Sequence, residues 1–224
     1  MSFETAIRNR LTAARLYGIL DLGYVAAESL ERFAAQLCEG GVDIVQLRAK
    51  GRDECDIEAM GNRIAPILRE AGVPFIINDH PALVPGVGAD GAHVWQDDFS
   101  VDDARWRAGR ALGGEVPLPI IGNSTHSVEQ AVAAAVEGAD YIGFGPLFPT
   151  PTKAGRPAIG LADVARVHGL VSVPIFCIGG VKLENLDAVI AAGARRVVIV
   201  SGILQAEDVA GYCREVKARL GNDE

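Results

Sequence analysis

The chain has 224 residues, 49% of them hydrophobic and 22% charged, and this composition excludes a disordered or collagen-like protein. Its length fits one domain, and a (β/α)8 barrel needs about 200 residues or more. The formal net charge of -8 argues against binding to nucleic acid or to an anionic membrane surface, because both are polyanions. Any anionic ligand must therefore be held by a local cationic site.

The N-terminal segment mixes charged side chains such as Glu4, Arg8 and Arg15 with apolar ones, and it lacks the apolar core of a signal peptide. It predicts a short amphipathic helix at about 3–15, leading into a single domain that spans 1–224. No apolar run reaches the roughly 18 residues of a membrane span, so we expect a cytoplasmic enzyme. Whether it forms a homo-oligomer stays open.

The cysteines lie far apart and form no CxxC pair. They predict free thiols, buried or inert, in place of a zinc or redox site. The four residues are Cys38, Cys55, Cys177 and Cys213.

Short apolar runs rich in β-branched residues alternate with stretches of helical periodicity, which is typical of repeated βα units. The predicted strands are 16–20, 44–47, 74–77, 91–94, 119–122, 141–144, 175–178 and 196–200. The predicted helices include 29–39, 57–71, 128–136, 161–168 and 183–192, with helix ends at Gly40, Gly41, Gly72, Gly138 and Gly193 and a capping box at Ser127 and Gln130. A spacing of about 25 residues favours a closed (β/α)8 TIM barrel, with an open α/β sheet as the alternative.

Polar side chains follow the second predicted strand, where Gln46, Arg48 and Lys50 alternate along the sequence and so point to one face. An isolated buried charge is costly, so a ligand or a carboxylate must meet these groups. Because the active site of such a barrel lies at the carboxyl ends of its strands, we expect all three in the barrel mouth.

Carboxylates follow the next two strands. Asp79 comes after Asn78 at the end of the third strand, and Asp98 follows the fourth. This placement suggests a Mg2+ site, since Mg2+ is usually bound by one or two carboxylates with waters and substrate phosphates. The alternative is that Asp79 and Asp98 cap helices or pair with Arg48 and Lys50.

Loops after the later strands offer anion-binding groups. The proline-rich segment 145–160 carries Thr150, Thr152 and Lys153, and its alternative role is that of a stiff connector. Ser124, after the fifth strand, either contacts a substrate or turns the chain. Glycines at the ends of the seventh and eighth strands predict a phosphate site, because backbone N–H groups can approach phosphate oxygens there. The residues at these two strand ends are Gly179, Gly180, Ser201 and Gly202.

These motifs together resemble the thiamine-phosphate synthase family over about 17–204, most specifically in the sequences QLRAK and GPLFPTPTK. The family condenses 4-amino-5-hydroxymethyl-2-methylpyrimidine diphosphate with a thiazole phosphate and releases pyrophosphate. The resemblance implies an SN1-like substitution, in which pyrophosphate leaves before the thiazole nitrogen attacks. It also implies Mg2+ as the cofactor.

The resemblance assigns Mg2+ to Asp79 and Asp98. The residues implied around the pyrimidine diphosphate are Gln46, Arg48, Lys50, Asn78 and Lys153, with Ser124 beside the pyrimidine or the pyrophosphate. The residues implied on the thiazole-phosphate side are Thr150 and Thr152 with the backbone of Gly180, Ser201 and Gly202. The implied catalytic residues are Arg48, Ser124 and Lys153.

One departure from the family pattern is Trp95, where the family usually has glycine. Either the indole turns out of the mouth or it reshapes the pocket. His93 and His126 are expected to pack beneath the ligand without transferring a proton. Two rival functions stay open: a related thiazole tautomerase, which needs no diphosphate or metal set, and a catalytically silent phosphate-binding barrel.

Overall fold

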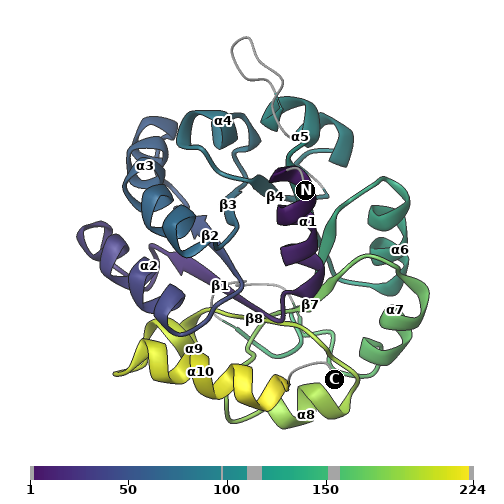
Figure 1. The fold of residues 1–224 in the computed structure, drawn as a ribbon. Helices are drawn as coiled ribbons and strands as arrows, with labels where there is room; N and C mark the ends of the chain where they lie inside the picture. Colours follow the sequence, from purple (N-terminus) through teal and green to yellow (C-terminus); the bar gives the residue numbers. More distant parts are fainter. Residues whose placement is uncertain (1–2, 97, 110–117, 151–156, 222–224) are drawn as a thin grey trace.

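The computed structural model describes residues 3–96, 98–109, 118–150 and 157–221. Within these ranges, parallel strands follow one another in chain order around a closed barrel, and the last strand pairs with the first (Figure 1). The strands are β1 (Leu16–Asp21), β2 (Ile44–Arg48), β3 (Phe75–Asn78), β4 (Gly91–Trp95), β5 (Ile120–Thr125), β6 (Tyr141–Phe144), β7 (Ile175–Cys177) and β8 (Val197–Ile199). This closure confirms the predicted (β/α)8 barrel and excludes the open sheet.

Every predicted apolar run overlaps one of these strands, and the differences lie at the strand ends. The largest concerns β5, which continues to Thr125 because Ser124 and Thr125 pair with Gly143 and Phe144 of β6. Ser124 is therefore a strand residue, and the alternative that it merely turns the chain is wrong. Its side chain is held by the sheet at the carboxyl end of the barrel.

The barrel interior is filled with side chains. Tyr17, Tyr141 and Phe176 are fully buried there, and the ring of Phe176 meets the two tyrosine rings edge-on at centroid distances of 5.4 and 5.7 Å. Such contacts satisfy the preferred geometry of aromatic pairs. These rings form a solid floor beneath the carboxyl ends of the strands.

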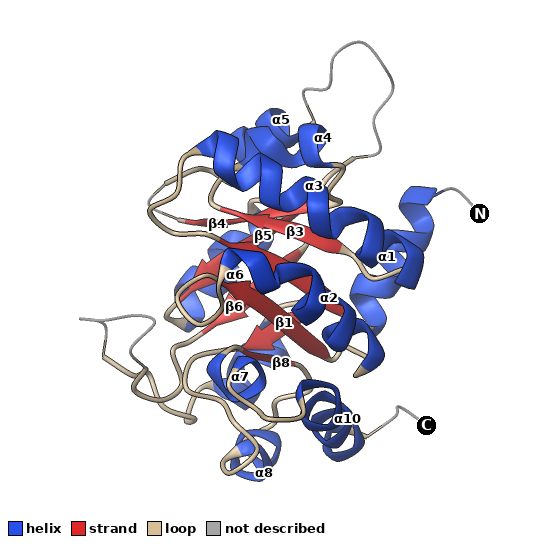
Figure 2. Cartoon of the chain, turned by 90° about the vertical axis from the view of Figure 1, so that its left-hand side faces the viewer, coloured by secondary structure: helices blue, strands red, loops and turns tan. Residues whose placement is uncertain are grey.

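Helices cover the outer face of the sheet (Figure 2). Those of the described chain are α1 (Phe3–Ala13), η1 (Ala27–Ser29), α2 (Leu30–Glu39), α3 (Glu54–Ala71), η2 (Pro81–Leu83), α4 (Val84–Val87), α5 (Val101–Ala108), α6 (Val128–Val136), α7 (Val164–Leu170), α8 (Leu186–Ala191), α9 (Ser201–Leu204) and α10 (Val209–Leu220). None of them is both long and apolar enough to cross a membrane.

The first helix, α1, crosses one end of the ring (Figure 1). Leu11 packs into the interior cluster together with Ala14, which immediately precedes β1. This helix therefore closes the amino-terminal end of the barrel. A ligand must enter at the opposite end, where the strands finish.

Side-chain caps explain where several helices begin. Asp53 accepts a hydrogen bond from the N–H of Asp56 at 2.8 Å, so α3 starts at Glu54, earlier than the predicted 57. Ser127 caps α6 as predicted, by accepting from the N–H of Gln130 at 3.2 Å. A capping box also needs the Gln130 side chain to accept from the N–H of Ser127. Gln130 Oε1 accepts instead from the N–H of His126, so the predicted capping box is only half formed.

The other predicted helix boundaries differ by a few residues. The helices predicted from 161 and 183 begin later, at Val164 and Leu186. The glycines with positive φ after helices are Gly41, Gly72, Gly138 and Gly193, as predicted, whereas Gly40 has φ −74°. Gly40 instead allows close packing of α10, because a Cβ there would lie 2.5 Å from Cβ of Cys213.

All four cysteines are free. Cys177 and Cys213 are buried as expected, and burial raises the pKa of each thiol to about 12. Cys55 is exposed and Cys38 is half-buried, so the expected burial does not extend to them.

Candidate active site

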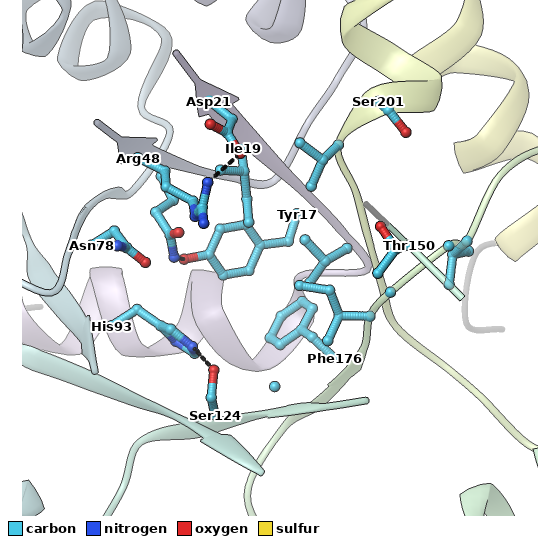
Figure 3. A pocket seen from close by; sticks show the side chains of 18 of the residues that line it. Tyr17, Ile19, Asp21, Arg48, Asn78, His93, Ser124, Thr150, Phe176 and Ser201 are labelled. Carbon is cyan, nitrogen blue, oxygen red and sulfur yellow. Dashed lines mark hydrogen bonds and ion pairs between the residues drawn. The ribbon is translucent and has the colours of Figure 1, made fainter. Parts of the chain in front are cut away.

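A cavity lies at the carboxyl ends of the strands, above the aromatic floor (Figure 3). It collects residues from every quarter of the barrel, including many that the sequence singled out. The predicted site residues that line it are Gln46, Arg48, Asn78, Ser124, Thr150, Gly180 and Ser201. The barrel thus brings members of both predicted groups, the diphosphate-binding residues and the thiazole-phosphate-binding residues, to one cavity.

Four predicted site residues of the described chain do not line the cavity: Lys50, Asp79, Asp98 and Gly202. Gly202 packs against α10, since a Cβ there would lie 2.5 Å from Oη of Tyr212. Thr152 and Lys153 lie outside the described residues.

The cationic wall of the cavity is built on β1 and β2. Arg48 Nη1 donates to Asp21 Oδ2 at 2.7 Å, and Asp21 is only 2% exposed. The other oxygen, Asp21 Oδ1, accepts from the N–H of Gly23 at 2.9 Å. The expectation that Arg48 needs a carboxylate or ligand is therefore met by Asp21, which the sequence analysis missed. The alternative that Arg48 pairs with Asp79 or Asp98 is therefore wrong.

Beside this wall, Lys50 forms an ion pair with Asp79 through Oδ2. Asp79 sits at φ 62°, an uncommon left-handed conformation, and its N–H donates to the carbonyl of His93 at 2.9 Å. Its second oxygen, Oδ1, is buried and accepts no hydrogen bond from the described residues. The predicted Lys50–Asp79 pairing thus forms and leaves one carboxylate oxygen for another ligand.

Asp98 is exposed, and its N–H donates to the carbonyl of Trp95 at 3.1 Å. The adjacent helix α5 is capped by Ser100, which accepts from the N–H of Asp103. The alternative that Asp98 caps a helix is therefore wrong, and Asp79 likewise caps none of the described helices. The described chain contains no cluster of three or more His, Cys, Asp or Glu side chains placed to hold a metal.

A chain of hydrogen bonds crosses the floor of the cavity. It joins Gln46 Nε2 to Tyr17 Oη at 2.8 Å, Tyr17 Oη to Tyr141 Oη at 2.9 Å, Tyr141 Oη to His93 Nδ1 at 3.1 Å, and His93 Nε2 to Ser124 Oγ at 2.9 Å. Burial raises the pKa of both tyrosines, so both phenols keep their protons. Neither tyrosine was among the predicted site residues, because an aromatic side chain is an ordinary residue of a buried strand.

The two histidines near the cavity differ in their contacts. His93 is buried and stacked on Tyr141 at a centroid distance of 5.5 Å, in the floor of the cavity. His126 Nδ1 hydrogen-bonds to the carbonyl of Gly145, and its ring packs against Trp95 at 5.6 Å. Trp95 lines the cavity. The indole therefore shapes the pocket and does not turn away from it.

The opposite side of the cavity is made of backbone. The segment after β6 runs along the end of β7, with Leu147 N–H donating to Ile178 O and Phe148 N–H donating to Gly179 O, both at 2.9 Å. This approach requires glycine, since a Cβ on Gly179 would lie 2.4 Å from Cα of Pro146. Gly179 and Gly180 also have positive φ, at 95° and 68°. The result is a wall in which main-chain groups can come close to a ligand.

A closed parallel barrel with a cavity at the carboxyl ends of its strands, lined by Arg48 on one side and by glycines on the other, defines a (β/α)8-barrel enzyme. A family model described as thiamine monophosphate synthase matches residues 16–203. The chain belongs to this family.

Individual relatives agree with this assignment. The thiamine-phosphate synthase of Thermus thermophilus is 43% identical over 199 residues, 88% of this chain and 92% of that protein. The thiamine-phosphate synthase of Thermobifida fusca is 42% identical over 97% of both chains. A solved thiamine phosphate pyrophosphorylase from Pyrococcus furiosus superposes with a TM-score of 0.80 at 29% identity, covering 96% of this chain and 97% of that one. A tryptophan synthase of Mycobacterium tuberculosis, at 17% identity and TM-score 0.68, shares the fold.

Proposed function

We propose that this transferase condenses 4-amino-5-hydroxymethyl-2-methylpyrimidine diphosphate with thiazole phosphate in the presence of Mg2+, giving thiamine phosphate and pyrophosphate. The observation that carries the proposal is the two-sided cavity, in which Arg48 and Asn78 lie on one side and Thr150 and Ser201 on the other (Figure 3). Two phosphate-bearing substrates need two such sides. We expect the enzyme to work in the cytoplasm.

The diphosphate side serves the leaving group. Arg48, held by Asp21, presents a fixed planar donor set to phosphate oxygens. Lys50 lies next along the same strand end, and Lys153 is proposed to complete the cationic set from outside the described residues. Positive charge placed where pyrophosphate departs stabilises the charge that develops on it. Gln46, Asn78 and Ser124 would hold the pyrimidine end of the same substrate.

The fit of the site to Mg2+ rests on Asp79. Its buried Oδ1 accepts no hydrogen bond from the described chain, and a carboxylate oxygen in that state suits a hard cation. Asp98, exposed after β4, would be the second ligand, and the substrate phosphates would supply others. When bound, Mg2+ acts as a Lewis acid toward the leaving pyrophosphate.

The thiazole phosphate would bind on the glycine-lined side. Backbone groups of Gly180, Ser201 and Gly202 are proposed to meet its phosphate, with Thr150 and Thr152 beside them. The packed aromatic floor excludes water from below, which protects a pyrimidinylmethyl cation from hydrolysis until the thiazole nitrogen attacks.

Calorimetry with pyrophosphate and Mg2+, followed by an assay for thiamine phosphate, separates this function from its rivals. A thiazole tautomerase should ignore pyrophosphate, and a silent phosphate-binding barrel should bind it without turnover. Within the proposed function, Lys153→Ala and Asp98→Ala each abolish most turnover while the circular dichroism spectrum and unfolding midpoint stay close to those of the wild type. Unchanged activity in both variants contradicts the proposal.

A further inference from the structure

The hydrogen-bonded chain in the cavity floor has a direction, and Gln46 sets it. The side-chain amide nitrogen of Gln46 carries only hydrogens to give, so at 2.8 Å it donates to Tyr17 Oη. Tyr17 must then direct its single hydrogen to another acceptor. Its other recorded partner is Tyr141 Oη at 2.9 Å, so Tyr17 donates to Tyr141.

The direction of donation continues from Tyr141 to the imidazole of His93. Tyr141 has accepted from Tyr17, and its own hydrogen goes to His93 Nδ1 at 3.1 Å. A neutral imidazole carries one hydrogen, and with Nδ1 accepting, that hydrogen is on Nε2. His93 Nε2 therefore donates to Ser124 Oγ at 2.9 Å.

The chain ends on Ser124 at the edge of the cavity, where His93 and Ser124 face each other (Figure 3). Because Ser124 Oγ accepts from His93, its own hydrogen is left for the cavity. A reversed chain would turn that hydrogen toward His93 and present only lone pairs to a ligand. The direction of the chain thus decides whether Ser124 offers a hydrogen-bond donor or an acceptor to a ligand.

We propose that Gln46, Tyr17, Tyr141 and His93 form a one-way hydrogen-bond chain that fixes Ser124 as a donor toward a hydrogen-bond acceptor of the bound substrate, a phosphate oxygen or a pyrimidine nitrogen. Tyr17, Tyr141 and His93 are positioning residues that act through Ser124. The identity of the acceptor rests on the proposed function, whereas the direction of the chain belongs to the free protein. Burial supports the arrangement, since it raises the pKa of both tyrosines and keeps their donor hydrogens in place.

The direction can be measured without any substrate, by long-range proton–nitrogen correlation on protein labelled with 15N-histidine. The signal of His93 is assigned by its loss in His93→Gln. At slightly alkaline pH the wild type is expected to show a pyrrole-type Nε2 and a pyridine-type Nδ1. The opposite tautomer, with hydrogen on Nδ1, overturns the proposal. A failed condensation assay would not affect this result, so the two claims fail separately.

A reversal variant tests whether Gln46 is the cause. In Gln46→Glu, studied at a pH at which the new carboxyl group is ionised, the carboxylate only accepts, so Tyr17 donates to it, Tyr141 donates to Tyr17, and His93 is expected to switch to the Nδ1–H tautomer. A Gln46→Glu protein that keeps the wild-type tautomer overturns the role of Gln46.

Two tyrosine variants provide a second test that does not depend on the Glu variant folding. Tyr141→Phe removes the donor to His93 Nδ1 and should shift that nitrogen resonance. Tyr212→Phe makes the same chemical change outside the chain, where the hydroxyl accepts from the N–H of Leu183, and should leave the His93 signals in place. Equal effects of the two variants on His93 contradict the proposal.

Discussion

Arg48 and Asp21 stand directly opposite each other in the register of β1 and β2 and form an ion pair of 2.7 Å in the wall of the cavity. The Asp21 carboxylate is nearly inaccessible, at 3% side-chain exposure, and its second oxygen is held by the N–H of Gly23. The guanidinium is therefore positioned before any ligand arrives. Fixing a binding group in this way lowers the cost of ordering it later.

Asp21→Asn should lower both stability and substrate affinity. It leaves the half-buried Arg48 without a charged partner, and we expect the free energy of unfolding to fall by about 2 kcal/mol in urea titrations. The KM for the pyrimidine diphosphate should rise roughly tenfold, because a displaced guanidinium no longer positions the leaving group. Glu31→Gln is the control: its pair with Arg63 is 40% exposed on both sides, and its loss should change stability by less than about 1 kcal/mol. Equal losses in the two variants would refute the special role of Asp21.

Asp79→Asn should weaken the response to Mg2+. The substitution removes the charge of a carboxylate whose buried Oδ1 has no hydrogen-bond partner in the described chain. In titrations of initial rate against Mg2+, we expect the half-saturating concentration to rise on the order of tenfold or more. Asp102→Asn changes an exposed carboxylate in the first turn of α5 and should leave the titration unaltered. An unaltered titration for Asp79→Asn would remove Asp79 from the metal site.

Gly122→Ala should disrupt the cavity floor. A Cβ on Gly122 would lie 2.1 Å from Cζ of Tyr141, in the middle of the hydrogen-bonded chain. Moving a buried ring to relieve that overlap costs about 3 kcal/mol, which thermal or urea unfolding would register. Gly169→Ala, in α7 with no atom within 4 Å of the added carbon, should instead be neutral or stabilise by up to about 1 kcal/mol. A tolerated Gly122→Ala would mean that the floor is not tightly packed.

His168 should make stability depend on pH in mildly acidic solution. Burial, followed by the charges of Arg195 and Arg196, lowers its pKa from the ordinary 6.5 to about 4. As the pH falls, the unfolded chain protonates its histidine near pH 6.5, whereas the folded chain does so only near pH 4. The stabilisation that comes from the neutral, buried His168 is therefore complete above about pH 6.5 and is lost as the pH falls toward 4. Urea titrations across this range should show a smaller loss of stability in His168→Gln than in the wild type. Parallel losses would contradict the lowered pKa.

The fold could be predicted from the sequence because each strand of this barrel is buried on both faces and reads as a short apolar run. The helix ends were harder to place. Asp53 extends α3 by a side-chain cap, whereas the residues before Val164 and Leu186 form turns despite their helical periodicity. Such local competition between turn and helix is decided by tertiary packing.

Arg48, Asn78 and Ser124 were predicted from strand-end position and from the family resemblance, and all three line the cavity. The partner of Arg48 was not predicted, because alternation along a strand gives the face of a side chain but not its neighbour on the next strand. Asp21 directly follows the predicted apolar run 16–20, and the strand register places it beside Arg48. Tyr17 and Tyr141 escaped notice for a similar reason, since only the closed barrel brings their hydroxyls together.

The most direct test of the proposed function is a quantitative assay of the purified protein with both substrates, monitoring thiamine phosphate and pyrophosphate together. We predict that the two products appear in equal amounts with Mg2+ and that chelation by EDTA stops the reaction. Folded protein that forms no thiamine phosphate from both substrates in the presence of Mg2+ would contradict the proposal.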